Sequence, residues 1–268
     1  MTKKSTIQVE EVNDHIVNWL KDYAKNANVN GFVIGISGGI DSAVTSTLCA
    51  QTGLKVLCVE MPIHQHASHV SRGKEHIKQL QDKFTNVSSV VADLTASFET
   101  FKKALPTEQI EETKLNLTLA NTRARLRMTT LYYFAGIHGL LVAGTGNKVE
   151  DFGVGFYTKY GDGGVDLSPI ADLMKSEVFA LGAYLKVPQS ILVAQPSDGL
   201  FGDDKSDEDQ LGASYDELEW AMISDEKGVS VDGGFSEREK VVFSIYKKLN
   251  KVNQHKMNPI PVCLINRD

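Results

Sequence analysis

The stretch GFVIGISGGIDSAVTSTL, residues 31–48, joins an apolar run to a glycine loop and the start of a helical pattern. Residues 32–36 predict a short strand that is buried on both faces of a parallel sheet. The glycine pair Gly38 and Gly39 lets the backbone turn tightly and brings its N–H groups close to an anion. A helix that opens at Ile40 adds the positive end of its dipole. The stretch therefore predicts a loop that binds pyrophosphate.

Three polar side chains flank the glycine pair. The hydroxyls of Ser37 and Ser42 can bind phosphate oxygens, and Asp41 can hold a divalent cation against them. A glycine pair between a strand and a helix is often only a tight connection, but that interpretation gives no reason for these three residues to lie together. The chain contains neither GxxxxGK[ST] nor GxGxxG, so the two common nucleotide loops do not explain the motif.

Composition sets limits on the class of protein. The 268 residues are 42% hydrophobic and 23% charged, which is ordinary for a soluble globular protein, and a net charge of −6 argues against a nucleic-acid partner. No apolar run reaches membrane-spanning length, and the N-terminus lacks the apolar core of a signal peptide. Cys49, Cys58 and Cys263 stand singly among apolar residues, so we expect buried free thiols in a cytoplasmic protein.

Strand patterns alternate with helix patterns along the chain. The expected order is a helix over 7–25, a strand over 32–36, a helix from 40, a strand over 55–61, a helix over 68–83, a strand over 87–92, a helix over 108–136 and a strand over 140–143. This order predicts one α/β domain, residues 1–268, built on a single doubly wound parallel sheet flanked by helices. Ligands of such sheets bind beyond the carboxyl ends of the strands.

Two loop-rich segments follow the fourth strand. Residues 143–178 read AGTGNKVEDFGVGFYTKYGDGGVDLSPIADLMKSEV, and loops of this length in compact domains are usually functional. A helix is expected from about Asp172 to Lys186. The acidic, glycine-flanked stretch within residues 200–212 predicts a mobile lid over the site.

The motif SGGIDS resembles the pyrophosphate loop of the ATP-pyrophosphatase (adenine-nucleotide alpha-hydrolase) superfamily, whose members split ATP between its α and β phosphates. Together with GTGNKVE, FYTKYGDGGVDLSPI and MKSEV, it is similar to the ammonia-dependent NAD synthetases, and the resemblance runs from about Gly31 to Lys256. It implies an adenine-nucleotide alpha-hydrolase-like fold, a homodimer, and amidation of deamido-NAD to NAD by free ammonia. The reaction would pass through an NAD-adenylate and release AMP and pyrophosphate.

The resemblance also assigns roles to residues. It implies ATP binding by Gly35, Ile36, Ser37, Gly38, Gly39, Ile40, Asp41, Ser42, Thr145, Lys175 and Ser197. It implies deamido-NAD binding by Arg125, Lys159, Asp166, His255 and Lys256. The cofactor Mg²⁺ would be held by Asp41 and Glu150, which supply the oxygen ligands that this ion prefers. Asp41 and Lys175 are the expected catalytic residues, and Asp162 in the YGDGG turn is a candidate neighbour of the ammonia.

Some features need a choice or depart from the family pattern. Arg123, Arg125 and Arg127 lie two residues apart on a helix and cannot all face one ligand; the family pattern selects Arg125. One residue more than in that pattern lies between Glu150 and Lys159. Ser197 stands where threonine is usual, and the hydroxyl is retained.

Two other functions stay open at this point. SGGIDS alone also fits a different ATP-pyrophosphatase, such as one that amidates a purine nucleotide or thiolates tRNA; the segment KYGDGGVDLSPI and the net acidity argue against both. A nucleotide-binding regulatory protein without turnover is the alternative outside the enzymes, but Asp41 and Glu150 are both present. The length leaves no room for a glutamine-hydrolysing domain, so free ammonia is the expected nitrogen donor.

Overall fold

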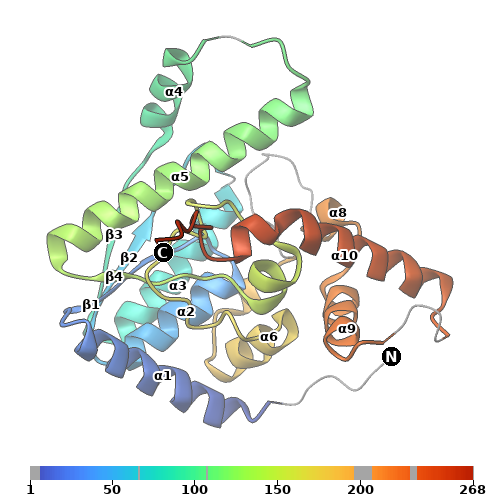
Figure 1. Cartoon of the computed structure of the whole chain (residues 1–268). Coiled ribbons are helices and arrows are strands. Elements are labelled where there is room, and N and C mark those ends of the chain that lie inside the picture. Colours follow the sequence, from blue (N-terminus) through green and yellow to red (C-terminus); the bar gives the residue numbers. More distant parts are fainter. Residues whose placement is uncertain (1–6, 66, 107, 196–206, 230–233, 268) are drawn as a thin grey trace.

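A four-stranded parallel sheet lies at the centre of the computed structural model, which describes residues 7–65, 67–106, 108–195, 207–229 and 234–267 (Figure 1). The strands run in the order β3-β2-β1-β4. Their bounds are β1 Gly31–Gly35, β2 Lys55–Glu60, β3 Val87–Val91 and β4 Leu141–Val142. The order reverses between β1 and β4, as in a doubly wound sheet. The predicted fold class is confirmed.

Helices cover both faces of this sheet. One face carries α1 (Val9–Asn26), α2 (Ile40–Gln51) and α3 (Ala67–Lys83), and the other carries the long helix α5 (Glu112–His138). The remaining elements are α4 (Thr95–Ala104), the π-helical turn η1 (Val149–Val154), α6 (Lys175–Tyr184), α7 (Gln189–Leu192), α8 (Asp207–Leu211), α9 (Tyr215–Glu226) and α10 (Glu237–Met257).

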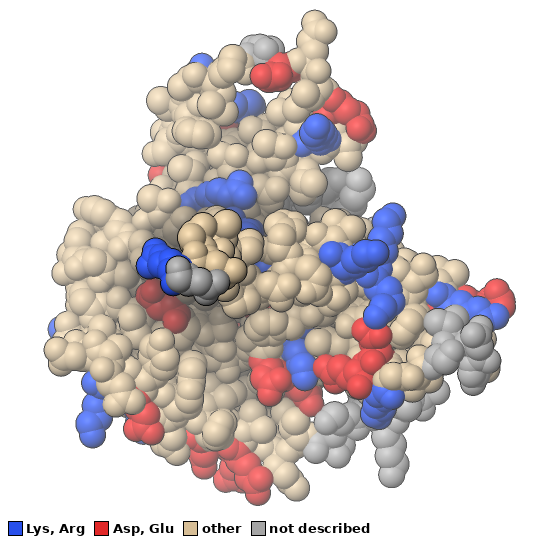
Figure 2. Space-filling model, viewed as in Figure 1, with Lys and Arg blue, Asp and Glu red and all other residues tan. Residues whose placement is uncertain are grey.

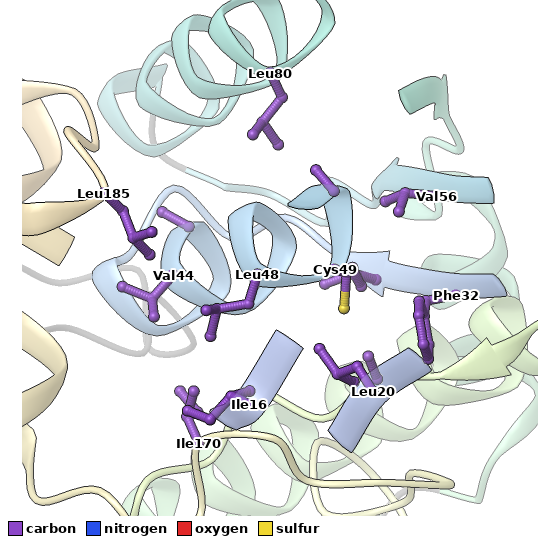
Figure 3. Packing of buried hydrophobic residues seen from close by; sticks show 14 of the residues in the cluster. Ile16, Leu20, Phe32, Val44, Leu48, Cys49, Val56, Leu80, Ile170 and Leu185 are labelled. Carbon is purple, nitrogen blue, oxygen red and sulfur yellow. The ribbon is translucent and has the colours of Figure 1, made fainter. Parts of the chain in front are cut away.

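Alternation along β1 divides the core into two layers. Phe32 and Ile34 point into the cluster formed with α1, α2 and α3, and Val33 between them points toward α5. Figure 3 shows Val44 and Leu48 of α2 within the first of these layers. Because successive strand residues face opposite sides, an unbroken apolar run is what a strand covered on both faces requires.

A third apolar cluster lies beside the sheet. Val149 and Val154 of η1 pack there against Leu218 and Met222 of α9 and Tyr246 of α10. Both valines are almost fully buried, and Asn250 donates to the carbonyl of Gly153 at 2.7 Å. The π-helical turn between the two valines is therefore held in place by this cluster.

The sequence predictions agree with most of these bounds. Each predicted strand overlaps an observed one, and ends within one or two residues of it. Helix α4, at Thr95–Ala104, was not predicted, and α6 begins at Lys175, three residues later than expected. Cys49 and Cys58 are buried free thiols, but the prediction for Cys263 was wrong because this residue is exposed.

Two further expectations concern the lid and membranes. Of the expected lid, residues 200–206 lie outside the described part of the chain, whereas Asp207–Leu211 forms the short helix α8. Among the described helices, none is both long and apolar enough to cross a membrane. On the face shown in Figure 2, lysine and arginine side chains are scattered among acidic ones and form no continuous basic patch.

A buried histidine makes the stability of the fold depend on pH. His76 of α3 is 1% exposed, its Nε2 lies 2.8 Å from the Ser46 hydroxyl, and burial lowers its pKa to about 4. The unfolded chain binds this proton near pH 6.5, so stability falls as pH drops from 6.5 toward 4, by about 1.4 kcal/mol per pH unit. We expect urea unfolding of His76→Leu to be less pH-dependent than that of the wild type over this range. Equal slopes for the two proteins would contradict this assignment, and His15→Leu, at an exposed position, is the control.

Candidate active site

The loop between β1 and α2 forms the base of the site. The hydroxyls of Ser37 and Ser42 lie 3.1 Å apart, and Ser37 Oγ accepts the N–H of Gly39 at 3.2 Å. Ser42 Oγ in turn donates to the Gly39 carbonyl at 3.0 Å. These contacts tie the two ends of the loop together around the glycine pair. The first turn of α2 then points its free N–H groups at the space above the loop, which is the arrangement that binds phosphate oxygens.

Gly38 is required for this turn. Its φ is +82°, a left-handed conformation, and a β-carbon placed there would lie 2.4 Å from the carbonyl oxygen of His69 in α3. The Gly38 carbonyl accepts from Arg72 Nε at 3.2 Å. Any side chain at position 38 would therefore push α3 away from the loop.

Asp41, Glu150 and Lys175 meet beside the loop. Lys175 Nζ lies 2.7 Å from Asp41 Oδ2 and 3.0 Å from Glu150 Oε1, although the three residues come from α2, η1 and α6. The lysine side chain is 4% exposed. Asn147 Nδ2 adds a donor to Asp41 at 3.1 Å. Two carboxylates thus share a single buried cation.

The neighbours of Lys175 fix where it lies. It is the first residue of α6, and the Glu219 carboxylate from α9 accepts both the N–H of Ser176 at 2.8 Å and its hydroxyl at 2.7 Å. A carboxylate at a helix N-terminus stabilises that end of the helix. Lys175 at the same end gains nothing from the dipole, so its place is explained by the two carboxylates instead.

The charges in this group shift each other's pKa in different directions. Burial alone would lower the pKa of Lys175, but Asp41 and Glu150 outweigh burial and raise it. Burial raises the pKa of Asp41, which Lys175 offsets only in part. Burial also acts to raise the pKa of Glu150, but Lys175 and the Tyr215 hydroxyl together lower it. With all three groups ionised, one negative charge remains unbalanced and available to a further cation.

A cavity of about 270 Å³ opens above the loop at the carboxyl edge of the sheet. Most of the residues predicted to bind ATP or the metal ion or to act in catalysis line it: Gly35, Ile36, Ser37, Gly38, Gly39, Ile40, Asp41, Ser42, Thr145, Glu150, Asp162 and Lys175. Ser197, also predicted to bind ATP, lies outside the described residues. The structure therefore brings residues from five separate segments to one cavity.

Asp151 is an acidic residue of this cavity that sequence reasoning missed. It lies in η1, and its carboxylate occupies the space that a side chain at Gly146 would need. Burial and the nearby charges of Glu150, Asp162 and Asp41 raise its pKa to about 8. The π turn accounts for its position, because Gly155 N–H bonds to the Glu150 carbonyl across one residue more than an α-helical turn contains.

Two cationic residues of the cavity were also missed. Arg127 of α5 lines it and donates to the Met61 carbonyl at 3.0 Å, and Arg72 of α3 lines it from the opposite side. The family pattern had selected Arg125 among the three arginines of α5. Arg125 is instead exposed and outside the cavity lining, with its guanidinium 3.3 Å from the Lys159 carbonyl. Which of the three arginines faces the cavity depends on which side of α5 packs against the rest of the protein. The sequence alone does not give that orientation.

Four of the five predicted deamido-NAD residues lie near one another beside the cavity. Arg125 contacts the Lys159 carbonyl, and Lys159 Nζ donates to the carbonyl of His255. Lys256 Nζ donates to the carbonyls of Gly155 at 2.7 Å and Tyr157 at 2.8 Å. Tyr157 itself lines the cavity, so Lys256 borders it.

The fifth residue, Asp166, lies elsewhere. Its carboxylate accepts the Tyr132 hydroxyl at 2.9 Å and the Val142 N–H at 2.8 Å. These bonds hold the segment after the YGDGG turn against β4, where Ala143 and Leu167 form a parallel bridge. Asp166 does not line the cavity.

The residues present fit a magnesium ion that also binds phosphate. Among the described residues, no three His, Cys, Asp or Glu side chains form a complete metal site. Asp41 and Glu150 both contact one cation, Lys175 Nζ, so the two carboxylates lie close enough to bind the same positive charge. Two carboxylates completed by phosphate oxygens and water form the type of shell that Mg²⁺ takes in nucleotide sites.

Comparison with known proteins agrees with this geometry. The sequence model of the family described as NAD synthase matches residues 12–260. The NH(3)-dependent NAD(+) synthetase of Carboxydothermus hydrogenoformans is 35% identical over 92% of this chain and 94% of its own length. That of Methanosarcina mazei is 35% identical over 96% of this chain and 98% of its own length.

Solved structures resemble the fold over nearly its whole length. The NMN synthetase of Francisella tularensis is 30% identical, with a TM-score of 0.83 over 97% of this chain and all of its own. The NH3-dependent NAD synthetase of Campylobacter jejuni is 23% identical, with a TM-score of 0.77 over 96% of this chain and all of its own. This second comparison shows similarity of fold. The glycine loop, the cavity above it and the match over residues 12–260 lead to one conclusion: the chain belongs to the NAD synthase family.

Proposed function

We propose that this protein amidates deamido-NAD to NAD with ATP and free ammonia. The observation that carries the proposal is the meeting of Asp41, Glu150 and Lys175 beside the glycine loop, in one cavity at the carboxyl edge of the sheet. A carboxylate is a poor acyl donor, because its charge repels nucleophiles and oxide is a poor leaving group. Joining this carboxylate to AMP gives it a good leaving group, and the site holds the groups that this step requires.

In the first half-reaction, an oxygen of the nicotinate carboxylate attacks the α-phosphorus of ATP, and the bond to the β-phosphate oxygen breaks. Pyrophosphate leaves into the loop Gly35–Ser42, where backbone N–H groups and the N-terminus of α2 stabilise its charge. Lys175, already in place between two carboxylates, adds positive charge beside the phosphates. Asp41 and Glu150 would hold Mg²⁺, which offsets phosphate charge when bound.

In the second half-reaction, the ammonia nitrogen attacks the carbonyl carbon of the adenylate, AMP leaves and one proton is lost. The acidic residues Asp151 and Asp162 line the cavity beside Asp41 and Glu150, and the unbalanced negative charge of that group favours a small cation such as ammonium there. Support for free ammonia comes from the Carboxydothermus relative, which is named for NH3 and of which this chain spans 94%. The cations Arg125, Lys159 and Lys256 suit the diphosphate of deamido-NAD, and the contacts that group them at the border of the cavity support this assignment.

A homodimer is part of the proposal. Of the 27 residues of α5, only Ala120, Ala124 and Ala135 are buried, and Tyr133 and Ile137 are 63% and 58% exposed. The C-terminal segment adds exposed apolar residues at Ile260, Val262, Leu264 and Ile265. Exposed apolar residues such as these favour a second copy of the chain as their cover. Sedimentation at micromolar concentration tests this, and a monomer would contradict it. The cytoplasmic location stays a prediction.

The direct test is an assay with purified protein, ATP, Mg²⁺ and deamido-NAD, following NAD, AMP and pyrophosphate. We expect NAD and AMP to appear in equal amounts with ammonium and not with glutamine. Pyrophosphate without NAD would retain the ATP chemistry and reject the acyl substrate. ATP binding without any turnover would overturn the proposal in favour of a regulatory protein.

A second candidate substrate deserves the same assay. The Francisella structure, which resembles this chain with a TM-score of 0.83, is described as an NMN synthetase. The corresponding substrate here would be nicotinic acid mononucleotide, which carries the same reacting carboxylate without the adenylyl half. A kcat/KM higher for the mononucleotide than for deamido-NAD would make it the preferred substrate.

A further inference from the structure

Tyr215, at the start of α9, reaches into the group formed by Asp41, Glu150 and Lys175. Its hydroxyl donates to Glu150 Oε1 at 2.6 Å, and its ring centre lies 4.7 Å from Lys175 Nζ. The side chain is buried at 5% exposure and packs in the cluster of η1, α9 and α10. One buried side chain therefore contacts both the predicted metal ligand and the lysine beside it.

The two contacts of Tyr215 are chemically distinct. The ring face attracts the lysine cation and needs only an aromatic side chain. The hydroxyl binds the carboxylate and needs a donor at the tip of the ring, which phenylalanine lacks. Because hydrogen bonds to a charged group are the stronger ones, the hydroxyl restricts how the Glu150 carboxylate can turn.

The hydrogen bonds of Glu150 show which way its carboxylate is held. The donors Tyr215 and Lys175 both bind the same oxygen, Oε1. Its backbone N–H also bonds to the side chain of Asn147, which donates in turn to Asp41. With Oε1 engaged in this way, neither donor occupies the second oxygen, Oε2.

Tyr215 is itself held from several sides. Its N–H donates to Glu208 of α8 at 2.9 Å. The helix it begins has a capping box between Ser214 and Glu217, and Arg238 of α10 forms two 2.7 Å bonds to the Glu217 carboxylate. A rigid support for a ligand-orienting side chain is the usual requirement of a metal site.

We propose that Tyr215 is a positioning residue, whose hydroxyl orients the Glu150 carboxylate toward Asp41 so that the pair can share a divalent cation. The inference rests on the proposed function only through the role of Glu150 as a metal ligand. It concerns metal affinity and not the identity of the acyl substrate, so the two can fail separately.

The test is Tyr215→Phe, which removes the hydroxyl and keeps the ring over Lys175. Mn²⁺ binding is measured by electron paramagnetic resonance in the presence of α,β-methylene-ATP, and the apparent KM for Mg²⁺ is measured in the NAD assay. We expect Mn²⁺ affinity to fall about tenfold and the KM for Mg²⁺ to rise by a similar factor. Nucleotide affinity without metal should stay within twofold of the wild type.

Tyr246→Phe is the matched control, because Tyr246 is buried in the same cluster at 4% exposure. It should leave Mn²⁺ affinity unchanged. Equal effects of the two variants on metal binding, or no effect of Tyr215→Phe, would overturn the proposal. The Glu150→Gln background provides a second measurement, in which adding Tyr215→Phe should not weaken Mn²⁺ binding further. A full additional loss there would also overturn it.

Discussion

Asp41→Asn should lower the rate of NAD formation about a thousandfold while leaving the fold intact. A metal ligand beside the phosphates contributes several kcal/mol to transition-state stabilisation, and each 1.4 kcal/mol is a factor of ten in rate. The fold should persist because asparagine keeps the size of the residue and Lys175 still pairs with Glu150 at 3.0 Å. The measurements are steady-state turnover at saturating ATP and Mg²⁺, and thermal unfolding followed by circular dichroism.

Asp172→Asn is the control for this variant. Asp172 lies just before α6, its side chain is 98% exposed, and it pairs with Lys148 outside the cavity. Its variant should turn over at the wild-type rate. A rate for Asp41→Asn within tenfold of the wild type would remove Asp41 from the metal site.

Lys175→Met should damage both catalysis and stability, and the loss of stability should be partly reversed by magnesium. Methionine keeps the length of the side chain but removes the charge, so Asp41 and Glu150 then face each other without their shared cation. Breaking a buried ion pair by removing one partner typically costs about 3–5 kcal/mol of unfolding free energy. Turnover should fall at least a hundredfold, because the cation beside the phosphates is lost.

The magnesium dependence separates this explanation from a simple packing defect. A divalent cation can replace the missing ammonium between the two carboxylates, so millimolar Mg²⁺ should raise the unfolding midpoint of Lys175→Met more than that of the wild type. Lys148→Met is the control. Lys148 also forms ion pairs with two carboxylates, but outside the cavity, with Asp172 at 3.4 Å and Glu226 at 3.7 Å. An identical gain from Mg²⁺ in the variant and the wild type would contradict the role of Lys175.

The sequence predicted the sheet and the glycine loop between β1 and α2 because their signals are local. Phe32–Ile34 is an apolar run of strand length, and Gly38 supplies a backbone conformation that other residues avoid. Helix α4 was missed because Thr95–Ala104 is short and only Phe98 of it is buried, so its apolar period is weak. The exposure of Cys263 was missed because its neighbours are apolar and yet lie in an exposed C-terminal segment.

The rest of the site depends on contacts between distant parts of the chain. Asp41 and Lys175 are 134 positions apart, and Tyr215 reaches Glu150 over 65 positions. The local motif pointed to Asp41 and family resemblance supplied Glu150 and Lys175, but nothing in the local pattern pointed to Tyr215. Asp151 was missed because its place in the cavity follows from a π-helical turn, which hydrophobic periodicity does not encode.

The π-helical turn at Val149–Val154 also bears on how chains of this kind can diverge in length. A π turn accommodates one residue more than an α turn, and its ends here are anchored by two buried valines. An insertion or deletion of a single residue can therefore be absorbed inside the turn, and the flanking segments keep their places. Related proteins can differ in length immediately beside Glu150, so aligning them by residue count alone would misassign the residues that follow.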